Sequence, residues 1–280
     1  MIATSFDYQR ASSIDDALQK LGAGGAKLLA GGHSLVPVMK MRLSEPAMLI
    51  DIARIPGLAG IRDQGSSIEI GAGTTHREVA ASALLRDRCP MIAETAADIG
   101  DPQVRNRGTL GGSLAHADPA ADYPAAILAL DAELQLQSTR GSRTVKASSF
   151  FQDVFTVDLA PDEMIVSIRF APVRAAAYAK LHQRASHFAI VGVAAAVQAS
   201  GGVITSARVG LTGAGSHATR LTAVEKAFEG QPATKASAAA AAALATLNEV
   251  NADIHASESY RRAMIPVFTR RALDAAIGRL

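Results

Sequence analysis

The sequence GTLGGSLA at residues 108–115, together with AGGHSL at residues 30–35, decides how this chain is interpreted. Glycine lets the backbone approach a ligand closely because no side chain stands in the way. Both stretches also carry small hydroxyl side chains, and successive main-chain N–H groups in such turns form concavities that bind phosphate. We call residues 30–35 the first turn and residues 108–115 the second turn. Two such turns predict a dinucleotide whose pyrophosphate is held from two sides.

The first turn matches neither of the two common phosphate-binding motifs. The Rossmann fingerprint requires G-x-G-x-x-G at the start of a helix, whereas Leu-Val-Pro at residues 35–37 is not expected to open a good helix. A P-loop would continue with Gly-Lys-Ser/Thr, which does not follow Gly32. Two adjacent glycines usually mark a plain turn, so the interpretation depends mainly on the second turn.

Charged and titratable residues surround the turns. Arg-Asn-Arg at residues 105–107 is near enough for its charge to act on a bound anion, although a solvated loop face would explain it equally well. Phosphate repels carboxylates, so Asp118 and Asp122 are expected to bind a ribose or ribityl hydroxyl instead. For His33 and His116 we favour positioning, or packing on a ring, over general-base catalysis, because no triad-like partner accompanies them.

Composition sets outer limits on the function. The chain has 280 residues, 49% of them apolar, which is enough for one large domain or two ordinary ones. Its 28 basic and 26 acidic residues leave a net charge of +2, which gives no case for nucleic-acid binding. Cys89 is the single cysteine, so an internal disulfide, an iron–sulfur cluster and a zinc site built on cysteines are excluded. With no secretory signal and no membrane-spanning stretch, a cytoplasmic protein is expected.

The N-terminal part combines short strands with amphipathic helices. Ser13, with Asp16 three residues later, precedes apolar residues at helical spacing and predicts a capped helix. Residues 101–122 show no period and are expected to form a long functional loop. The expected strands are 27–30, 48–52, 68–70, 134–137 and 164–170, and the expected helices are 14–21, 74 or 75 to about 85, 91–99 and 123–130.

The pattern changes after residues 171–174, which we interpret as a domain boundary. Three strands are expected at 178–183, 190–198 and 203–212, with a hairpin at Ser200-Gly201-Gly202, and helices at 219–229, 235–248 and 258–277. Pro266 is expected to kink the last helix or end a turn. Grouped strands followed by helices, without regular β-α-β alternation, predict an α+β fold rather than a doubly wound parallel sheet.

Three longer motifs carry a family resemblance: AGGHSLVPVMKMRL (30–43), GAGTTHR (71–77) and VRNRGTLGGSLAHADPAADYP (104–124). They resemble the FAD-binding medium subunit of molybdenum hydroxylases, the family of carbon monoxide dehydrogenase medium subunits that is related to the flavin domain of xanthine dehydrogenase. Residues 6–8, 184–191 and 207–215 resemble it too, so the likeness covers essentially the whole chain. The motif at 104–124 is highly specific, whereas Gly-Gly-His-Ser alone would not be.

The resemblance implies a fold and an assembly. It implies an FAD-binding domain at 1–173 with two subdomains (about 1–57 and 58–173) of the vanillyl-alcohol-oxidase or PCMH type. A small α+β domain with a three-stranded antiparallel sheet would follow at 174–280. It also implies a large molybdopterin subunit and a small subunit with two [2Fe–2S] clusters, in a dimer of heterotrimers. Electrons would pass from the clusters to FAD on this chain and then to an external acceptor.

The resemblance also implies site residues, but no catalytic side chain and no metal ligand on this chain. The first and second turns would hold the FAD diphosphate, Asp122 would bind a cofactor hydroxyl, and three isoleucines would approach the isoalloxazine ring. The implied cofactor-binding residues are Ala30, Gly31, Gly32, His33, Ser34, Leu35, Ile99, Thr109, Gly111, Gly112, Ser113, His116, Asp122, Ile165 and Ile190.

Two other functions stay open from the sequence. A stand-alone flavin oxidase would need a larger substrate domain with an acid/base pair, which the C-terminal part does not offer. A non-catalytic module could use the two turns for a nucleotide or another anion. The substrate of the implied complex would be selected by the large subunit and not by this chain.

Overall fold

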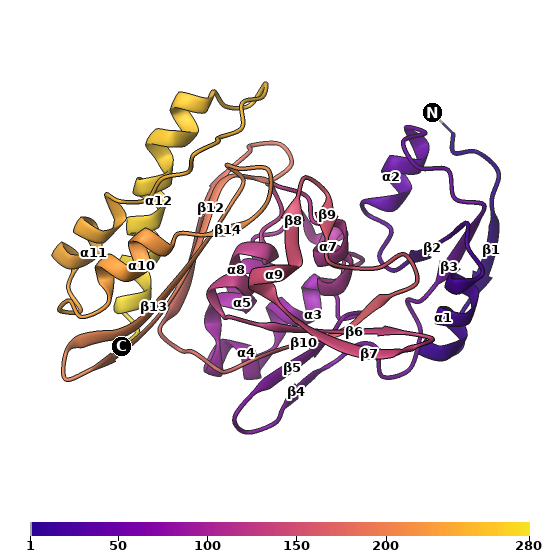
Figure 1. Cartoon of the computed structure of the whole chain (residues 1–280), viewed down its shortest axis with the longest axis horizontal. Coiled ribbons are helices and arrows are strands. Elements are labelled where there is room, and N and C mark those ends of the chain that lie inside the picture. Colours follow the sequence, from indigo (N-terminus) through magenta and orange to yellow (C-terminus); the bar gives the residue numbers. More distant parts are fainter. Residues whose placement is uncertain (1) are drawn as a thin grey trace.

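The computed structural model describes residues 2–280, which form three consecutive parts (Figure 1). The first part is a three-stranded parallel sheet of order β1-β3-β2 with two helices. Its elements are β1 (Asp7–Arg10), α1 (Ile14–Gly22), β2 (Ala26–Leu29), α2 (Leu35–Lys40) and β3 (Met48–Asp51). Ser13 caps α1 as expected, since its side chain accepts a hydrogen bond from the amide of Asp16 at 3.1 Å.

The second part is built on a five-stranded antiparallel sheet of order β4-β5-β10-β6-β7. Its strands are β4 (Ile61–Asp63), β5 (Ile68–Gly71), β6 (Glu133–Ser138), β7 (Gly141–Lys146) and β10 (Met164–Phe170), with a small hairpin of β8 (Phe151–Asp153) and β9 (Thr156–Val157). Its helices are α3 (His76–Ala81), α4 (Ala83–Arg88), α5 (Pro90–Ala97), α6 (Pro102–Arg105), α7 (Leu110–His116), α8 (Tyr123–Ala129) and α9 (Ala147–Phe150).

The third part packs an antiparallel sheet of order β11-β12-β13-β14 against three helices. Its elements are β11 (Ala176–His182), β12 (Ala189–Ser200), β13 (Val203–Thr212), β14 (Thr219–Arg220), α10 (Thr222–Phe228), α11 (Lys235–Ala242) and α12 (Glu258–Ile277). The α+β fold is confirmed, but the expectation of three strands is wrong, because β14 adds a fourth. At two residues, β14 is too short to show an alternating pattern, and it occupies the start of the helix expected at 219–229.

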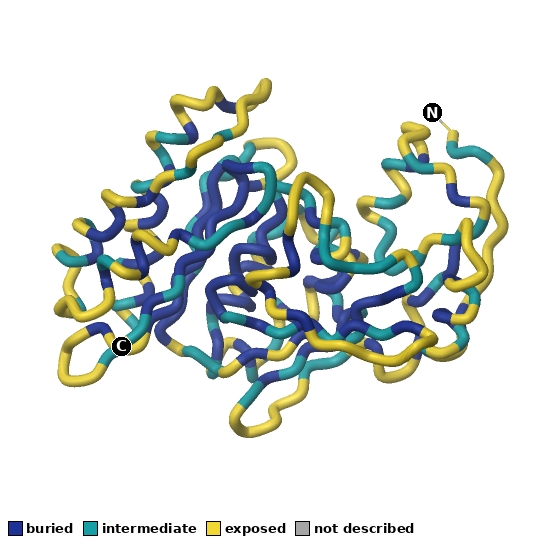
Figure 2. The backbone as a smooth tube through the Cα atoms, viewed as in Figure 1, coloured by how far each residue is buried: buried dark blue, intermediate teal, exposed yellow. Residues whose placement is uncertain are grey.

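Helix α8 joins the second and third parts. Every residue of α8 is buried, as its apolar sequence predicts, and the tube coloured by burial places it deep in the molecule (Figure 2). A Cβ at Gly210 of β13 would lie 2.9 Å from the carbonyl carbon of Ala125, so sheet and helix backbones are in direct contact. The third part is therefore packed against the second over a buried face.

Several expected elements differ in detail. Instead of one helix from residue 75 to 85, α3 ends at Ser82, whose extended backbone and capping side chain begin α4. Residues 101–122 are not a loop throughout, because Asp101 and Thr109 cap the short helices α6 and α7. A helix also follows the first turn, since Pro37 falls within the first turn of α2, where proline is tolerated. Helix α12 runs through Pro266 without ending. Within residues 2–280, no helix is long and apolar enough to cross a bilayer.

Candidate functional site

The first and second turns lie against each other. A Cβ placed on Gly31 would overlap the carbonyl group of Arg107 and come within 2.9 Å of the Cα of Gly108. A Cβ on Gly112 would lie 3.9 Å from the Cβ of Ala30. The two glycine-rich stretches, far apart in the sequence, therefore form one continuous backbone surface.

The first turn presents a row of unengaged main-chain donors. No hydrogen bond within the described residues 2–280 uses the amide groups of Gly31, Gly32, His33 or Ser34. Gly32 has a φ of 77°, a left-handed conformation that favours glycine and that redirects the chain from β2 into α2. Unpaired amide groups need a hydrogen-bonding partner, and a row of them suits an anion such as phosphate.

Most main-chain amides of the second turn already donate hydrogen bonds within the protein. The amides of Leu110 and Gly111 donate to the carbonyls of Thr74 and Ala72, both at 2.9 Å. The amide of Gly112 donates to Oγ1 of Thr109 at 3.1 Å. The expectation that both turns offer free N–H groups therefore holds for the first turn only. The hydroxyl-bearing residues of the second turn are Thr109, which is buried and whose Oγ1 accepts the Gly112 amide, and Ser113, which is half-buried.

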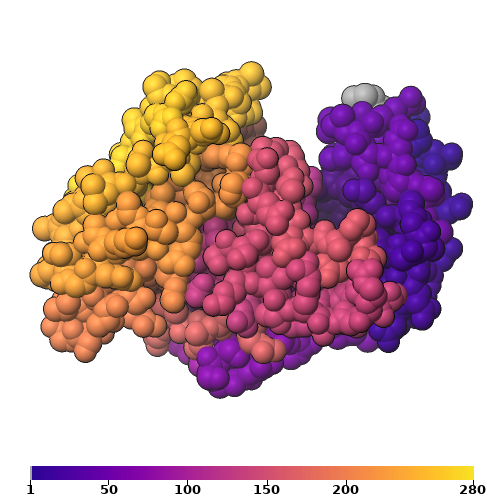
Figure 3. Space-filling model, viewed as in Figure 1, coloured from indigo at the N-terminus to yellow at the C-terminus, as the bar shows by residue number. Residues whose placement is uncertain are grey.

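Two small hollows flank the contact between the turns. One, of about 350 Å³, is lined by residues of the first turn and of α2 together with Arg107. The other, of about 120 Å³, is lined by Ala30, Thr75, Thr109 and again Arg107. The space-filling view shows the molecule notched between its N-terminal part and its middle part (Figure 3). Arg107 borders both hollows, so its charge acts on anything that spans them.

Charges near the turns divide into two groups. Arg107 and Lys40 line the larger hollow together with His33, so the hollow is cationic. Arg105 faces elsewhere, since its Nη1 donates to the carbonyls of Ile99 at 2.9 Å and of Gly100 at 3.0 Å. Of the two arginines considered as anion ligands, only Arg107 therefore borders the site.

His76 supports the second turn from behind. Its ring lies directly under Gly108, where a Cβ would be 2.8 Å from its Cδ2, and its centroid is 5.3 Å from that of Tyr123. Burial, and then the charges of His33 and Arg105, lower the pKa of His76 from 6.5 to about 4. His76 is therefore a neutral packing residue under the backbone that faces the first turn.

His116 also packs on a ring. It ends α7, and its imidazole lies 5.0 Å, centroid to centroid, from the ring of Phe155 at the tip of the β8–β9 hairpin. Burial lowers its pKa. This contact agrees with the packing role that we favoured for His116 over a general base.

Comparison with known proteins identifies the family of this chain. Residues 4–173 match the FAD binding domain in molybdopterin dehydrogenase, and residues 176–276 match the CO dehydrogenase flavoprotein C-terminal domain. The chain belongs to the family of FAD-binding medium subunits of molybdenum hydroxylases. As a medium subunit it is an oxidoreductase component, and the cofactor of its N-terminal domain is FAD.

Individual relatives agree over the full length of this medium subunit. It is 40% identical over 285 residues to the carbon monoxide dehydrogenase medium chain of Hydrogenophaga pseudoflava, covering 100% of this chain and 99% of the relative. It is 39% identical to the 6-hydroxypseudooxynicotine dehydrogenase complex subunit alpha of Paenarthrobacter nicotinovorans, covering 98% and 95%. Its fold matches the solved carbon monoxide dehydrogenase from Hydrogenophaga pseudoflava with a TM-score of 0.95 at 41% identity, covering 100% and 99%.

Asp122 of this medium subunit lies in a buried polar cluster. It is 4% exposed, and its Oδ1 accepts a hydrogen bond from the Tyr178 hydroxyl at 2.5 Å and lies 3.0 Å from Nζ of Lys180. Burial raises the pKa of Asp122 to about 6, although Lys180 and Tyr178 pull it down. Both contacts use Oδ1. Asp118, the other candidate, instead accepts from the amide of Ala120 in its own turn at 2.8 Å.

The sequence did not reveal Lys180 as a site residue. The side chain of Lys180 is completely buried, and its ammonium also donates to the carbonyls of Asp98 at 2.7 Å and His187 at 2.8 Å. The one available signal was a lysine on a strand of otherwise mostly apolar residues. A single such residue does not indicate which other residues contact it.

The three isoleucines expected near the ring lie on different elements. Ile99 directly follows Asp98 at the end of α5, and its carbonyl is held by Arg105. Ile190 is the second residue of β12, and its carbonyl accepts a hydrogen bond from Arg261 at 2.6 Å. Ile165 lies within β10 opposite Leu136 of β6 and is buried. Ile99 and Ile190 are half-buried, whereas only 5% of Ile165 is exposed.

Proposed function

We propose that this medium subunit is the electron-transfer flavoprotein of a multi-subunit molybdenum hydroxylase. It would take electrons from [2Fe–2S] clusters on a small partner and pass them to an external acceptor. A large molybdopterin subunit would oxidise the substrate, and the complex would be a dimer of heterotrimers. The observation that carries the proposal is the row of unengaged amides at Gly31–Ser34, in a turn whose backbone packs directly against the second turn.

The two turns supply different groups to the diphosphate. The amides of the first turn would bind its oxygens, as main-chain donors in a glycine-rich turn do. The hydroxyls of Thr109 and Ser113 would donate from the opposite side, and Arg107 would balance the negative charge. Oδ2 of Asp122 would accept a hydrogen bond from a cofactor hydroxyl, and Ile99, Ile165 and Ile190 would approach the ring. FAD, when bound, supplies the centre that accepts and releases electrons.

The substrate is proposed to be selected outside this chain. The two full-length relatives belong to a carbon monoxide dehydrogenase and to a 6-hydroxypseudooxynicotine dehydrogenase complex. Those substrates share little chemistry, yet the medium chains are about equally similar to this one. The chain's own contribution is then to bind FAD, orient it and expose one ring edge to an oxidant.

FAD titration of the purified apoprotein tests the proposal. Flavin fluorescence, which is excited in the visible where the polypeptide does not absorb, follows the uptake. Stoichiometric uptake is expected, with ADP competing because it shares the diphosphate. Failure to take up FAD while ADP still binds would favour a nucleotide-binding module.

Co-purification followed by mass identification tests the proposed assembly. It should recover a large chain and an iron–sulfur chain, and recovery of this chain alone would contradict the assembly.

A further inference from the structure

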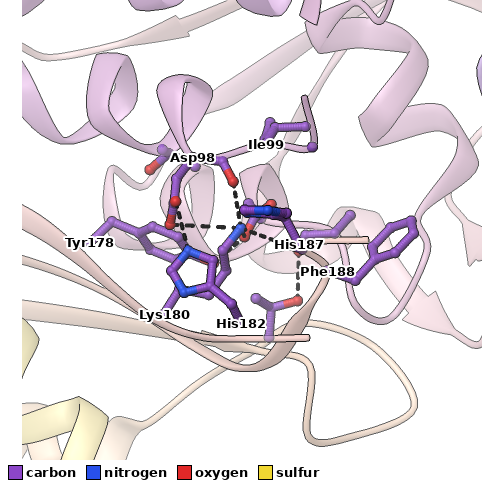
Figure 4. A network of polar contacts seen from close by, with 12 residues as sticks. Asp98, Ile99, Tyr178, Lys180, His182, His187 and Phe188 are labelled. Atoms are coloured by element: carbon purple, nitrogen blue, oxygen red, sulfur yellow. Dashed lines mark hydrogen bonds and ion pairs between the residues drawn. The ribbon is translucent and has the colours of Figure 1, made fainter. Parts of the chain in front are cut away.

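Lys180 is a buried cation with several oxygen partners. Its ammonium lies 3.0 Å from Oδ1 of Asp122 and donates to the carbonyls of Asp98 and His187. Two carbonyls accept its hydrogen bonds, and the carboxylates of Asp122 and, at 3.7 Å, Asp98 balance its charge. Burying a charge is costly unless it is paired and hydrogen-bonded. The close-up shows these contacts converging on Lys180 from several segments (Figure 4).

The oxygens around Lys180 come from separate parts of the chain. Asp98 caps the C-terminus of α5 and directly precedes Ile99. Asp122 precedes α8, and His187 lies in the loop that joins β11 to β12. One ammonium therefore connects the FAD-binding domain at two points with a loop of the C-terminal domain. A second side chain of the C-terminal domain also contacts Asp98, since Nε2 of His182 lies 2.7 Å from Oδ1 of Asp98.

The loop at residues 183–188 is otherwise held mainly by itself. Oε1 of Gln183 accepts from the amides of Ala185 and Ser186, and the amide of His187 donates to the carbonyl of Gln183. His187 has a φ of 61°, a left-handed conformation that non-glycine residues seldom adopt and that neighbouring contacts must maintain. The Lys180 bond to the His187 carbonyl fixes this strained peptide against the FAD-binding domain.

We propose that Lys180 is a positioning residue, which holds the Asp98–Ile99 segment and the 183–188 loop at a fixed spacing around the ring end of the cofactor. This inference rests on the proposed function, because Ile99 and Ile190 are placed near the ring there. Lys180 acts through the two carbonyls that it binds and has no need to touch the cofactor. Without it, the Ile99 segment and the loop keep the link through His182, which contacts Asp98 and packs on the His187 ring, but they lose the ammonium that bonds to both backbones.

The test compares two variants that differ only at Lys180. Asp122→Asn keeps an oxygen for both Tyr178 and Lys180, and it leaves the two carbonyl contacts of Lys180 in place. Lys180→Met/Asp122→Asn removes the ammonium without leaving a buried carboxylate unpaired. Lys235→Met, at an exposed lysine that begins α11, is the control for an ordinary lysine replacement. Thermal unfolding establishes that each variant is folded.

Two measurements follow. The first is tryptic cleavage after Arg184, an exposed residue of the loop, in the FAD-free protein. The second is the FAD dissociation constant, together with the visible circular dichroism of the bound flavin. Relative to Asp122→Asn, the double variant is expected to be cleaved faster and to bind FAD more weakly. Each change should be about tenfold or more, since one charge-assisted hydrogen bond to each segment is lost. Its flavin dichroism should also change, whereas Lys235→Met should match the wild type.

A folded double variant within twofold of Asp122→Asn in either cleavage or FAD affinity would overturn the proposal. An unchanged flavin dichroism would overturn it too. The surroundings of the ring would then be the same with and without Lys180, so Lys180 would not position the segments near the ring. Failure of the wild-type chain to bind FAD would instead refute the proposed function, and with it the positioning role. The cleavage assay would then still report whether Lys180 anchors the loop.

Discussion

The Cα of Gly31 lies so close to the carbonyl group of Arg107 that any side chain at residue 31 would overlap it. This contact joins the two glycine-rich turns into one backbone surface. A glycine is needed here because of this close approach and not because of its own φ. The contact therefore links a local sequence feature directly to the geometry of the proposed FAD site.

Gly31→Ala should weaken FAD binding by at least about tenfold. The added methyl group must push the turns apart, and overpacking of this kind costs about 1–3 kcal/mol, which corresponds to roughly one to two powers of ten in affinity. FAD titration and thermal unfolding measure the two effects. Gly22→Ala is the matched control, since a Cβ at Gly22, the last residue of α1, meets nothing within 4 Å. Equal affinities of Gly31→Ala and the wild type would show that the turns do not share one ligand.

Thr109→Val should lower FAD affinity beyond its effect on stability. The Thr109 hydroxyl caps α7, and loss of such a cap costs about 1 kcal/mol. It is also proposed to donate to the diphosphate. Thr234→Val removes the equivalent cap of α11, where the Thr234 side chain accepts from the amide of Ser237, far from the site. Both variants should lose similar stability, but only Thr109→Val should bind FAD less tightly. Equal FAD affinities of the two variants would limit Thr109 to its capping role.

The sequence was sufficient for features encoded locally. Ser13 and Asp16 specified the start of α1, and the second turn was recognisable from its own residues. The short helix α7 was missed, although Thr109 at its start is a good capping residue, because two glycines in seven residues weaken a helical pattern. Strand β14 was missed because two residues carry no period.

The buried cluster around Lys180 could not be predicted in the same way. Its partners Asp98, Asp122 and His187 lie on three segments. The spacing of these residues in the sequence does not predict that they contact one another. The contact exists only once α5, α8 and β11 have packed. Likewise, nothing local to the second turn shows that its amides of Leu110 and Gly111 are taken by Thr74 and Ala72.

Cys89 should be unreactive in the folded protein. Its side chain is fully buried, and burial raises the pKa of its thiol from 9.0 to about 12. The thiolate is the reactive form, so at mildly alkaline pH its fraction falls by about a thousandfold. Ellman's reagent should label the native chain negligibly and label it stoichiometrically in urea, with Cys89→Ala as the blank. Rapid labelling without denaturant would contradict this burial.

Arg261→Met should destabilise the C-terminal domain by about 3 kcal/mol, because two backbone carbonyls lose hydrogen bonds from a buried charged donor. Arg261 is 3% exposed, and it binds the carbonyls of Ile190 and Gly213 and the carboxylate of Asp253, each at 2.6 Å. Urea unfolding measures the change. Arg270→Met is the control on the same helix, because its side chain is 57% exposed and the replacement should cost under about 0.5 kcal/mol. Equal unfolding midpoints of the two variants would contradict the role assigned to Arg261.

His76 should make the stability of the chain depend on pH. Its pKa is about 4 in the folded chain against 6.5 for the free group, so below pH 6.5 the unfolded state binds the proton more readily. The stabilisation is complete above pH 6.5 and is lost as the pH falls toward 4, by about 3 kcal/mol in all. His76→Gln cannot take up this proton, so its unfolding free energy should fall less than that of the wild type over the same range. Because every other titrating group is common to both proteins, the difference between the two profiles isolates His76.

His255→Gln, at an exposed histidine, should follow the wild-type profile. Parallel profiles for the wild type and His76→Gln would show that protonation of residue 76 does not oppose the packing of the second turn.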